Sequence, residues 1–487
     1  MNTEPNAKRR GAYYTPDGAV ATLMRWAVRS ADDRLLDPAC GDGRFLAHHR
    51  NSVGIEQDLD AARQAMERAP GSLIHEGDFF AWAANTKERF DCAAGNPPFI
   101  RYQTFKGEVR ARALALCARL GAQFSALSSS WAPFLVATAG VLKPGGRMAF
   151  VVPAEIGHAP YAAPLLDHLV GNFAVVHVVA FREKMFPDLS EDCWLLFAEG
   201  RGDQATAIRF TALDGFKPMA APPRAHVEIP LREWRATWQR RLRPFLLPAA
   251  ARDAYATVLR EAGTRRLGDC AAVGIGYVSG DNAFFHLRPS QADALDIPPD
   301  YLMPSVRSAR LLPERRLTPD MVEGWRADDQ PMLLLNLPKA ARLPRSVQRY
   351  LSSEAAEIAQ AAYKCRNRDP WYSVPDVTIP DLFLTYMSGR RPALVENAAR
   401  CTCPNALHAV RLKPGFGTAD VTTGWDTDFT ALSCELEGHP LGGGMLKLEP
   451  REAARVALPG PAAACIMPAG MARDALATMR AWRHLAG

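Results

Sequence analysis

Short apolar runs alternate with helix-like patterns along the first 200 residues of the chain. Strands are predicted at 34–36, 52–55, 72–74, 90–94, 147–152, 174–180 and 193–198. Apolar positions spaced three or four apart predict helices at 19–30, 44–49, 60–68, 131–141 and 163–170. Strands that alternate with helices are typical of a mostly parallel sheet covered by helices. We therefore predict an α/β, doubly wound, Rossmann-like fold, with a Lys-Pro-Gly-Gly turn at 143–146 leading into the fifth strand.

The pattern changes between residues 217 and 248. This stretch holds six prolines, and its part from 232 to 243 is rich in arginine and tryptophan. Beyond it, short strand-like pieces are separated by many Pro and Gly turns, which indicates mixed α/β character. We predict a flexible N-terminus at 1–12, an α/β domain at 13–245 and a second domain at 246–487.

Composition excludes several classes of protein. With 48% hydrophobic and 23% charged residues, the chain is not of the disordered class. No apolar run approaches the ~18 residues of a membrane helix, and the N-terminus has no apolar core of a signal peptide. Ten cysteines in 487 residues are too sparse for a disulfide scaffold. We expect a cytoplasmic protein in reducing surroundings, with no membrane partner.

Basic residues gather in the later part of the chain. Residues 1–200 carry 21 Lys and Arg against 22 Asp and Glu, and the remainder carries 37 against 30. Only five of those 37 are lysines. Arginine makes bidentate contacts with phosphates and guanine edges, so the imbalance suggests a nucleic-acid partner. An ordinary solvated surface explains the charge equally well.

The first predicted strand ends in a glycine-rich loop that carries an acid. Residues 35–46 read LLDPACGDGRFL, which puts Asp37 at the strand tip. Glycines let the backbone turn tightly and leave room for a ligand at the carboxyl end of a strand. The loop lacks GxGxxG, and a carboxylate here would repel a pyrophosphate but attract an ammonium group. This favours the methionine end of S-adenosylmethionine over a nicotinamide dinucleotide; a structural turn is the alternative.

The next two predicted strands also end in acids. Glu56 closes the second strand and suits a pair of ribose hydroxyls. Asp78 closes the third strand, where its carboxylate could accept from an adenine amine while Phe79 packs on the ring. Taken singly, each acid is more often a solvated turn residue or a helix cap. As an ordered set, the three acids predict a site for a nucleoside-bearing cofactor.

The fourth predicted strand ends in Asn96-Pro97-Pro98-Phe99. The prolines fix two φ angles and remove two donors, which leaves a stiff corner rich in acceptors. The Asn96 side-chain oxygen and the Pro97 carbonyl can both accept from one NH₂ group. Because the lone pair of an aromatic amine is delocalised into its ring, two such acceptors favour the sp³ geometry that attacks a methyl group. Phe99 would stack on the base; a turn with a buried aromatic is the alternative.

These motifs, in this order, resemble those of the gamma class of DNA adenine-N6 methyltransferases, the TaqI-type enzymes. The resemblance is carried by YYTP at 13–16, DPACGDG at 37–43, NPPF at 96–99 and LKPGGRMAFVVP at 142–153. GIGYV at 274–278 with FF at 284–285 resembles the opening of recognition domains in this group. The resemblance implies a catalytic domain that binds S-adenosylmethionine at 13–245 and a DNA target-recognition domain at 246–487. It implies double-stranded DNA as substrate and a monomer, and it leaves open whether a separate restriction endonuclease is a further partner.

The resemblance also implies roles for single residues. Thr15 and Pro16 would contact the methionine moiety, and Ala39 and Gly41 would form the floor of its loop. Phe186 would supply a second aromatic face for a base flipped out of the duplex.

Two features depart from the family's pattern. Phe99 stands where many members have tyrosine, and the stacking face survives that change. Residues 101–130 match no part of the pattern that we can interpret.

Other chemistries are less well supported by the sequence. The spacings of Cys365, Cys401, Cys403, His408, Cys434 and His439 give no paired CxxC knuckles, so no metal is predicted. No glutamate is followed two positions later by lysine, so the chain lacks that half of a common nuclease site. A protein-glutamine methyltransferase and a DNA-binding pseudoenzyme remain as alternatives. The long arginine-rich second half disfavours the first, and the intact motifs disfavour the second.

Overall fold

The computed structural model describes residues 15–187, 189, 191–339, 342–441 and 443–485. The predicted N-terminal segment 1–12 lies outside these residues, as do Tyr13 and Tyr14. The chain divides into two compact units between Leu247 and Pro248, close to the predicted boundary at about 245. The roles assigned to the two domains stay predictions.

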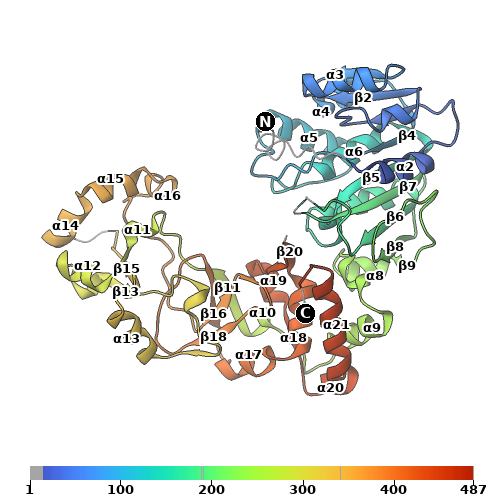
Figure 1. The fold of residues 1–487 in the computed structure, drawn as a ribbon. Helices are drawn as coiled ribbons and strands as arrows, with labels where there is room; N and C mark the ends of the chain where they lie inside the picture. The colour runs from blue at the N-terminus through green and yellow to red at the C-terminus, as the bar shows by residue number, and fades with distance from the viewer. Residues whose placement is uncertain (1–14, 188, 190, 340–341, 442, 486–487) are drawn as a thin grey trace. The chain divides into compact units, whose positions relative to one another are not determined.

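The described residues of the first unit form a nine-stranded sheet (Figure 1). Its strands are β1 (Leu35–Asp37), β2 (Ser52–Glu56), β3 (Leu73–Glu76), β4 (Phe90–Gly95), β5 (Leu142–Pro153), β6 (Phe173–Phe181), β7 (Cys193–Arg201), β8 (Ala207–Leu213) and β9 (Val227–Pro230). Their order is β3-β2-β1-β4-β5-β7-β6-β8-β9. Strands β1 to β5 are parallel, whereas β7 runs antiparallel between β5 and β6. The predicted α/β class with a parallel-rich sheet is confirmed.

Helices pack on this sheet. They are α2 (Asp17–Ala27), α3 (Leu59–Arg68), α4 (Phe79–Asn85), α5 (Gly107–Arg119), α6 (Trp131–Gly140), α7 (Ala162–Val170) and α8 (Leu231–Ala236), with short 3₁₀ turns at Leu46–His48, Ala154–Gly157 and Arg243–Leu246. Helix α2 packs against β4 and β5, while α6 packs against β5 and contacts α4, α5 and α7. The centre of β5 is fully buried because both of its faces are covered, which is typical of a parallel sheet.

One predicted turn is wrong. The Lys-Pro-Gly-Gly segment at 143–146 lies inside β5, where the pairing with β4 skips from Phe90↔Leu142 to Cys92↔Arg147. This bulge requires glycine, because Gly145 has a φ of +77°. A Cβ on Gly146 would also lie 3.1 Å from the carbonyl oxygen of Asp91.

The helix predicted at 44–49 is also wrong, because the structure has only the 3₁₀ turn Leu46–His48 there. Apolar residues in this short stretch pack beneath the loop after β1, so burial rather than helix periodicity explains them. Conversely, α5 lies in the segment 101–130 that the sequence left without an element.

The second unit is built around a five-stranded sheet of order β11-β19-β16-β18-β14. Its strands are β11 (Ala271–Ile275), β14 (Arg316–Leu317), β16 (Leu382–Thr385), β18 (Leu394–Asn397) and β19 (Leu407–Leu412). Smaller sheets are formed by β12 (His286–Leu287), β15 (Leu333–Leu335) and β13 (Leu302–Pro304), by β17 (Met387–Ser388), β21 (Met445–Lys447) and β20 (His439–Leu441), and by β10 (Arg265–Arg266) and β22 (Ala457–Leu458).

Short helices surround these sheets. They are α9 (Ala249–Val258), α10 (Leu267–Cys270), α11 (Asn282–Phe285), α12 (Pro289–Ala294), α13 (Pro319–Ala327), α14 (Arg345–Leu351), α15 (Glu354–Ala361), α16 (Tyr363–Arg366), α17 (Thr418–Trp425), α18 (Asp428–Glu437), α19 (Pro450–Arg455), α20 (Ala463–Ile466) and α21 (Ala469–Ala481). The predicted mixed α/β character of this half is confirmed.

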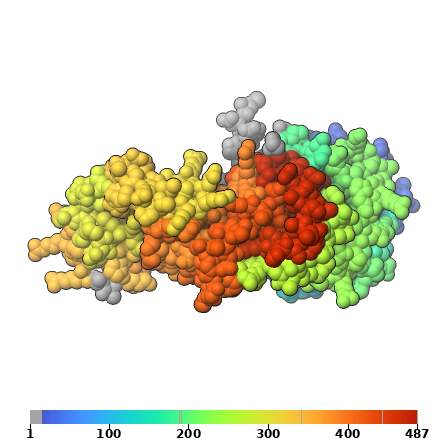
Figure 2. Space-filling view, turned by 90° about the horizontal axis from the view of Figure 1, so that it is seen from below, coloured from blue at the N-terminus to red at the C-terminus, as the bar shows by residue number. Residues whose placement is uncertain are grey.

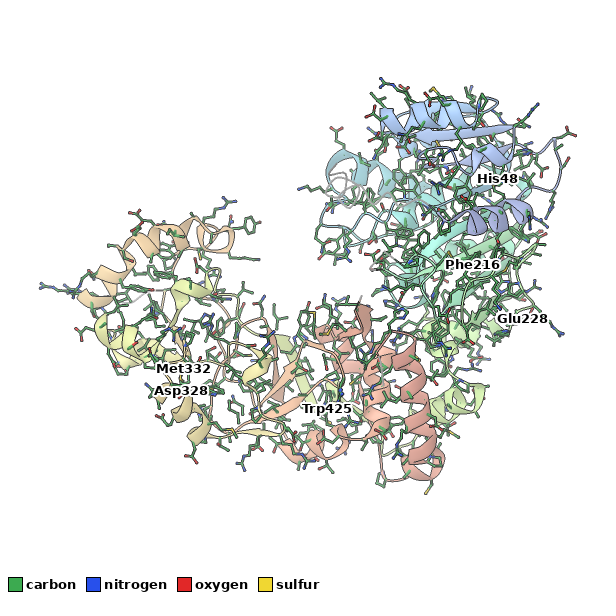
Figure 3. The ribbon with its side chains drawn as sticks, in the orientation of Figure 1. His48, Phe216, Glu228, Asp328, Met332 and Trp425 are labelled. Atoms are coloured by element: carbon green, nitrogen blue, oxygen red, sulfur yellow. The ribbon has the colours of Figure 1, made fainter. Side chains whose placement is uncertain are left out.

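Two apolar clusters hold the second unit together. Met332 belongs to the larger cluster and Trp425 to the smaller one (Figure 3). Helix α21 packs against α18, so the end of the chain, red in Figure 2, lies beside the orange residues that precede it. A fully buried ion pair links the residues just after α21 to α18, with Nη2 of Arg483 2.8 Å from Oε1 of Glu435.

Two further observations concern the described residues only. None of their helices is long and apolar enough to cross a membrane. Their His, Cys, Asp and Glu side chains do not converge in groups of three or more that could hold a metal ion. Cys365 Sγ and His408 Nε2, for example, each lie within hydrogen-bonding distance of a backbone carbonyl, of Ser279 and Leu448 respectively.

Candidate active site

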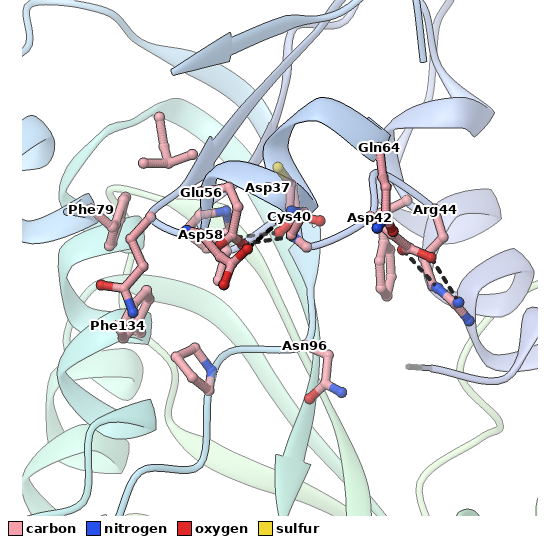
Figure 4. A pocket seen from close by; sticks show the side chains of 18 of the residues that line it. Asp37, Cys40, Asp42, Arg44, Glu56, Asp58, Gln64, Phe79, Asn96 and Phe134 are labelled. Carbon is pink, nitrogen blue, oxygen red and sulfur yellow. Dashed lines mark hydrogen bonds and ion pairs between the residues drawn. The ribbon is translucent and has the colours of Figure 1, made fainter. Parts of the chain in front are cut away.

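A cavity of about 360 Å³ opens at the carboxyl ends of β1 and β2 (Figure 4). The strand order reverses between β1 and β4, and ligands of open α/β sheets bind at such switch points. Eight residues predicted from the sequence line this cavity: Thr15, Asp37, Ala39, Gly41, Glu56, Asp78, Phe79 and Asn96.

Asp37 lies at the centre of the site and is almost completely buried. Its Oδ1 accepts from the backbone N–H of Ala39 at 3.2 Å, whereas its Oδ2 has no hydrogen-bond partner among the described residues. Burial raises the pKa of this carboxyl to about 8, and the charges of Glu56 and Asp42 add to the effect. A buried, unsatisfied acceptor is costly unless a ligand supplies the donor.

Glu56 shapes the loop that follows β1. Its Oε2 accepts from the N–H of Gly41 at 2.9 Å, and its Oε1 accepts from the N–H of Asp58 at 2.8 Å. Gly41 has a φ of +53°, and Gly43, two residues on, packs so closely on α3 that a Cβ would lie 2.8 Å from Cα of Ala65. The carboxylate thus holds the loop open in the conformation that creates the cavity.

Arg44 ties Thr15 to the same loop. Arg44 donates to the carbonyl oxygen of Thr15 at 2.6 Å and to both carboxylate oxygens of the buried Asp42. Burial alone would raise the pKa of Asp42, but hydrogen bonds from Arg44 and Arg68 lower it below its usual value. Asp42 therefore stays ionised as a structural partner.

Aromatic side chains form the other end of the cavity. Asp78 caps the N-terminus of α4, accepting from the N–H of Ala81 at 2.8 Å. Phe79 stacks on Phe134 with ring centroids 5.2 Å apart and planes 17° from parallel. Phe134 lines the cavity but was not predicted, because it sits in the uniformly apolar helix α6, far from Phe79 in sequence.

The corner after β4 is anchored from α6. Ser130 donates through Oγ to the carbonyl oxygen of Pro98 and accepts from the N–H of Ile100 at 3.0 Å. Asn96 is half-buried and lies on the cavity wall, below the acids in Figure 4. The two prolines and the two hydrogen bonds of the Ser130 hydroxyl make this corner rigid.

Four predicted residues do not line the cavity. Pro16 is exposed at the start of α2, and Pro97 is buried next to Asn96. Phe99 is half-buried and packs against the core, while Phe186 is 8% exposed inside that core. Their roles toward a substrate stay predictions.

The cavity suits a cationic, nucleoside-bearing ligand. Its walls carry Asp37, Asp42, Glu56, Asp58 and Asp78, with aromatic rings at one end. The unsatisfied oxygen of Asp37 fits an ammonium group, and paired rings fit an adenine. The residues present therefore fit the predicted cofactor, S-adenosylmethionine.

Three family matches together extend over both units. Residues 239–479 match the C-terminal domain of the type II methyltransferase M.Eco57I, and residues 45–186 match the Eco57I restriction-modification methylase. Residues 1–67 match the N-6 DNA methylase family. The last match supports S-adenosylmethionine as the cofactor.

Curated relatives match nearly the whole chain. The type II methyltransferase M.XamI of Xanthomonas campestris pv. amaranthicola is 26% identical, over 93% of this chain and 86% of its own length. M.AccI of Acinetobacter calcoaceticus is 18% identical, over 91% of this chain and 84% of its own length.

Among solved structures, the type IIL restriction-modification enzyme MmeI in complex with DNA has a similar fold. It matches with a TM-score of 0.50 and 13% sequence identity, over 88% of this chain. This chain spans 62% of the MmeI chain, and the likeness concerns the fold.

Proposed function

This chain belongs to the gamma class of N6 DNA methyltransferases of restriction-modification systems, and we propose that it transfers a methyl group from S-adenosylmethionine to the exocyclic amine of an adenine in duplex DNA. The observation that carries the proposal is the rigid NPPF corner, of which Asn96 and Pro98 line the acidic cavity. Acceptors for an amine thus lie beside residues that suit the methyl donor.

The cofactor is held by the acids and aromatics of the cavity. Oδ2 of Asp37 accepts from the methionine ammonium, and Glu56 accepts from the ribose hydroxyls. Asp78 accepts from the adenine amine, with Phe79 and Phe134 forming the apolar walls. When bound, S-adenosylmethionine supplies an electrophilic methyl group on a sulfonium.

The NPPF corner holds the target amine. The Asn96 side-chain oxygen and the Pro97 carbonyl accept hydrogen bonds from the two N–H groups of this amine. The lone pair of its nitrogen therefore points toward the methyl group. An adenine inside a duplex cannot reach this corner, and flipping it out costs a few kcal/mol. Stacking on Phe99, and on Phe186 once that side chain leaves the core, offsets part of this cost.

The second unit reads the DNA sequence in this proposal. Its match to the C-terminal domain of M.Eco57I and its arginine content support that role. A protein-glutamine methyltransferase would leave this unit without a function. We further propose that the protein acts in the cytoplasm as a monomer, together with a separate restriction endonuclease.

The test identifies the reaction product and measures both its rate of formation and the affinity for the cofactor. Duplex DNA is incubated with the full chain and S-adenosylmethionine, and its digested nucleosides are examined by mass spectrometry. We expect N6-methyladenine. Asn96→Ala should lower its rate of formation by orders of magnitude yet leave cofactor affinity nearly unchanged, because the proposal assigns Asn96 to the target amine and the acids of the cavity to the cofactor.

The control is Asn85→Ala, which alters an exposed amide on α4 that bonds the carbonyl of Ala81. Methylated cytosine as the only product, or a wild-type rate with Asn96→Ala, would overturn the proposal.

A further inference from the structure

The segment 101–130, which no motif explains, contributes a helix that packs on α4 and α6, the two helices whose Phe79 and Phe134 line the aromatic end of the cavity. Helix α5 packs against α4 and α6 through the buried side chains of Ala113, Leu116 and Cys117. The Sγ of Cys117 lies 3.7 Å from the carbonyl oxygen of Pro133, at the start of α6. Packing on two neighbours fixes the position of α5 relative to α4, the helix that Asp78 caps.

Arg112 extends from this helix to a cavity-lining acid. Its Nη1 is 3.1 Å from Oδ1 of Asp78, and the side chains of the pair are 41% and 20% exposed. The N–H of Ala81 donates to the same oxygen at 2.8 Å. Among the described residues both donors reach Oδ1, which leaves Oδ2 available to a ligand in the cavity. Because two hydrogen bonds from different directions hold Oδ1, the carboxylate cannot rotate freely. Its Oδ2 therefore keeps one direction.

We infer that Arg112 is a positioning residue for the cofactor. It orients the Asp78 carboxylate so that Oδ2 accepts a hydrogen bond from the exocyclic amine of the cofactor's adenine. Helix α5 is therefore part of the cofactor site. This inference rests on the proposed function, since it names what that site recognises at its aromatic end. The Ala81 cap fixes Asp78 along the axis of α4, and Arg112 restrains it from the side.

The inference differs from a purely stabilising role in one measurable respect. A surface ion pair that only braced α5 on α4 would affect every ligand of the cavity alike. A residue that orients Asp78 affects only ligands that carry the amine. A hydrogen bond from an amine to a carboxylate is stronger than one between neutral groups, so its loss is measurable as an affinity ratio.

The experiment measures this ratio by calorimetry with the full chain. The two ligands are S-adenosylhomocysteine and its 6-oxo analogue, in which a carbonyl replaces the adenine amine. The wild-type protein should prefer the amine by about tenfold or more, because the carbonyl would face the carboxylate. Arg112→Gln should reduce this preference several-fold while the affinity for the 6-oxo analogue changes less than about twofold.

Two further variants sharpen the comparison. Arg112→Lys keeps the charge and should retain part of the preference. Arg110→Gln, on the same helix but bonded to the carbonyl of Ala126, should retain all of it. Melting temperatures of all variants report whether α5 stays folded.

An unchanged preference in Arg112→Gln, or an equal loss of affinity for both ligands, would overturn this inference and leave the proposed function intact. The same holds if the wild-type protein binds both ligands equally. Failure of the wild-type protein to bind S-adenosylhomocysteine at all would overturn the proposed function as well.

Discussion

The most deeply buried carboxyl group of the cavity is that of Asp37. Asp37 carries an oxygen with no donor among the described residues and a pKa raised to about 8 by burial. A raised pKa means that the ionised form is disfavoured without a ligand, so at pH 7 the cofactor-free carboxyl holds a proton. An ammonium group bound at Oδ2 reverses this preference.

Cofactor binding should therefore release a proton from Asp37. Below pH 8 the free protein is protonated at this carboxyl and the complex is not, so affinity should rise with pH until about pH 8 and then level off. Calorimetry with S-adenosylhomocysteine at pH 7, in buffers of different ionisation enthalpy, should report release of about one proton. Asp37→Asn should abolish the release; an unchanged proton count in this variant would show that another group titrates.

At this scale the sequence predicted some site residues and missed others for a physical reason. Asp37, Glu56 and Asp78 could be assigned to one cavity because the ends of parallel strands meet at one sheet edge. Phe134 lines the cavity, and Arg112 contacts the cavity-lining Asp78, from helices whose packing no local pattern specifies. Phe186, assigned by resemblance, lies in the core, where local sequence gives no sign of its burial.

At the scale of elements, the site depends on how closely two strand ends approach. Gly95 ends β4 beside the tip of β1, and a Cβ there would lie 2.6 Å from Oδ1 of Asp37. The absence of a side chain lets the carboxylate sit between the two strands.

Gly95→Ala should destabilise the protein and weaken cofactor binding together. The added methyl group must push Asp37 or β4 aside, and such overpacking costs about 1–3 kcal/mol. We expect a lower free energy of unfolding in urea and a weaker affinity for S-adenosylhomocysteine. Gly71→Ala is the matched control, because its Cβ would meet Arg50 at an ordinary 3.6 Å. Equal effects of the two substitutions would contradict this account.

Elements with strong periodicity were predicted well, and those set by tertiary context were not. The strands at 52–55 and 90–94 and the helix at 131–141 lie within a residue or two of β2, β4 and α6. The bulge in β5 reads as a turn because Pro-Gly-Gly carries the same local signal in both settings. In the second unit, two- and three-residue strands are too short for any period to emerge.

The whole molecule combines two compact units of different character. The first holds the cavity and the NPPF corner, and the second matches the C-terminal domain of a type II methyltransferase. In the proposed function, the first unit performs the chemistry and the second selects the DNA sequence. Base contacts come from irregular loops, so neither sequence nor fold specifies the site that is recognised.

The central claim is most directly tested by sequencing methylated DNA. Unmethylated genomic DNA is treated with S-adenosylmethionine and either the full chain or residues 1–247, whose folding is checked by cofactor binding, and is then read by a method that detects N6-methyladenine. The full chain should methylate adenine within one short recognition sequence, and the truncated chain should bind cofactor without that selectivity. Absence of N6-methyladenine with the full chain, or the same selectivity from the truncated chain, would contradict the account.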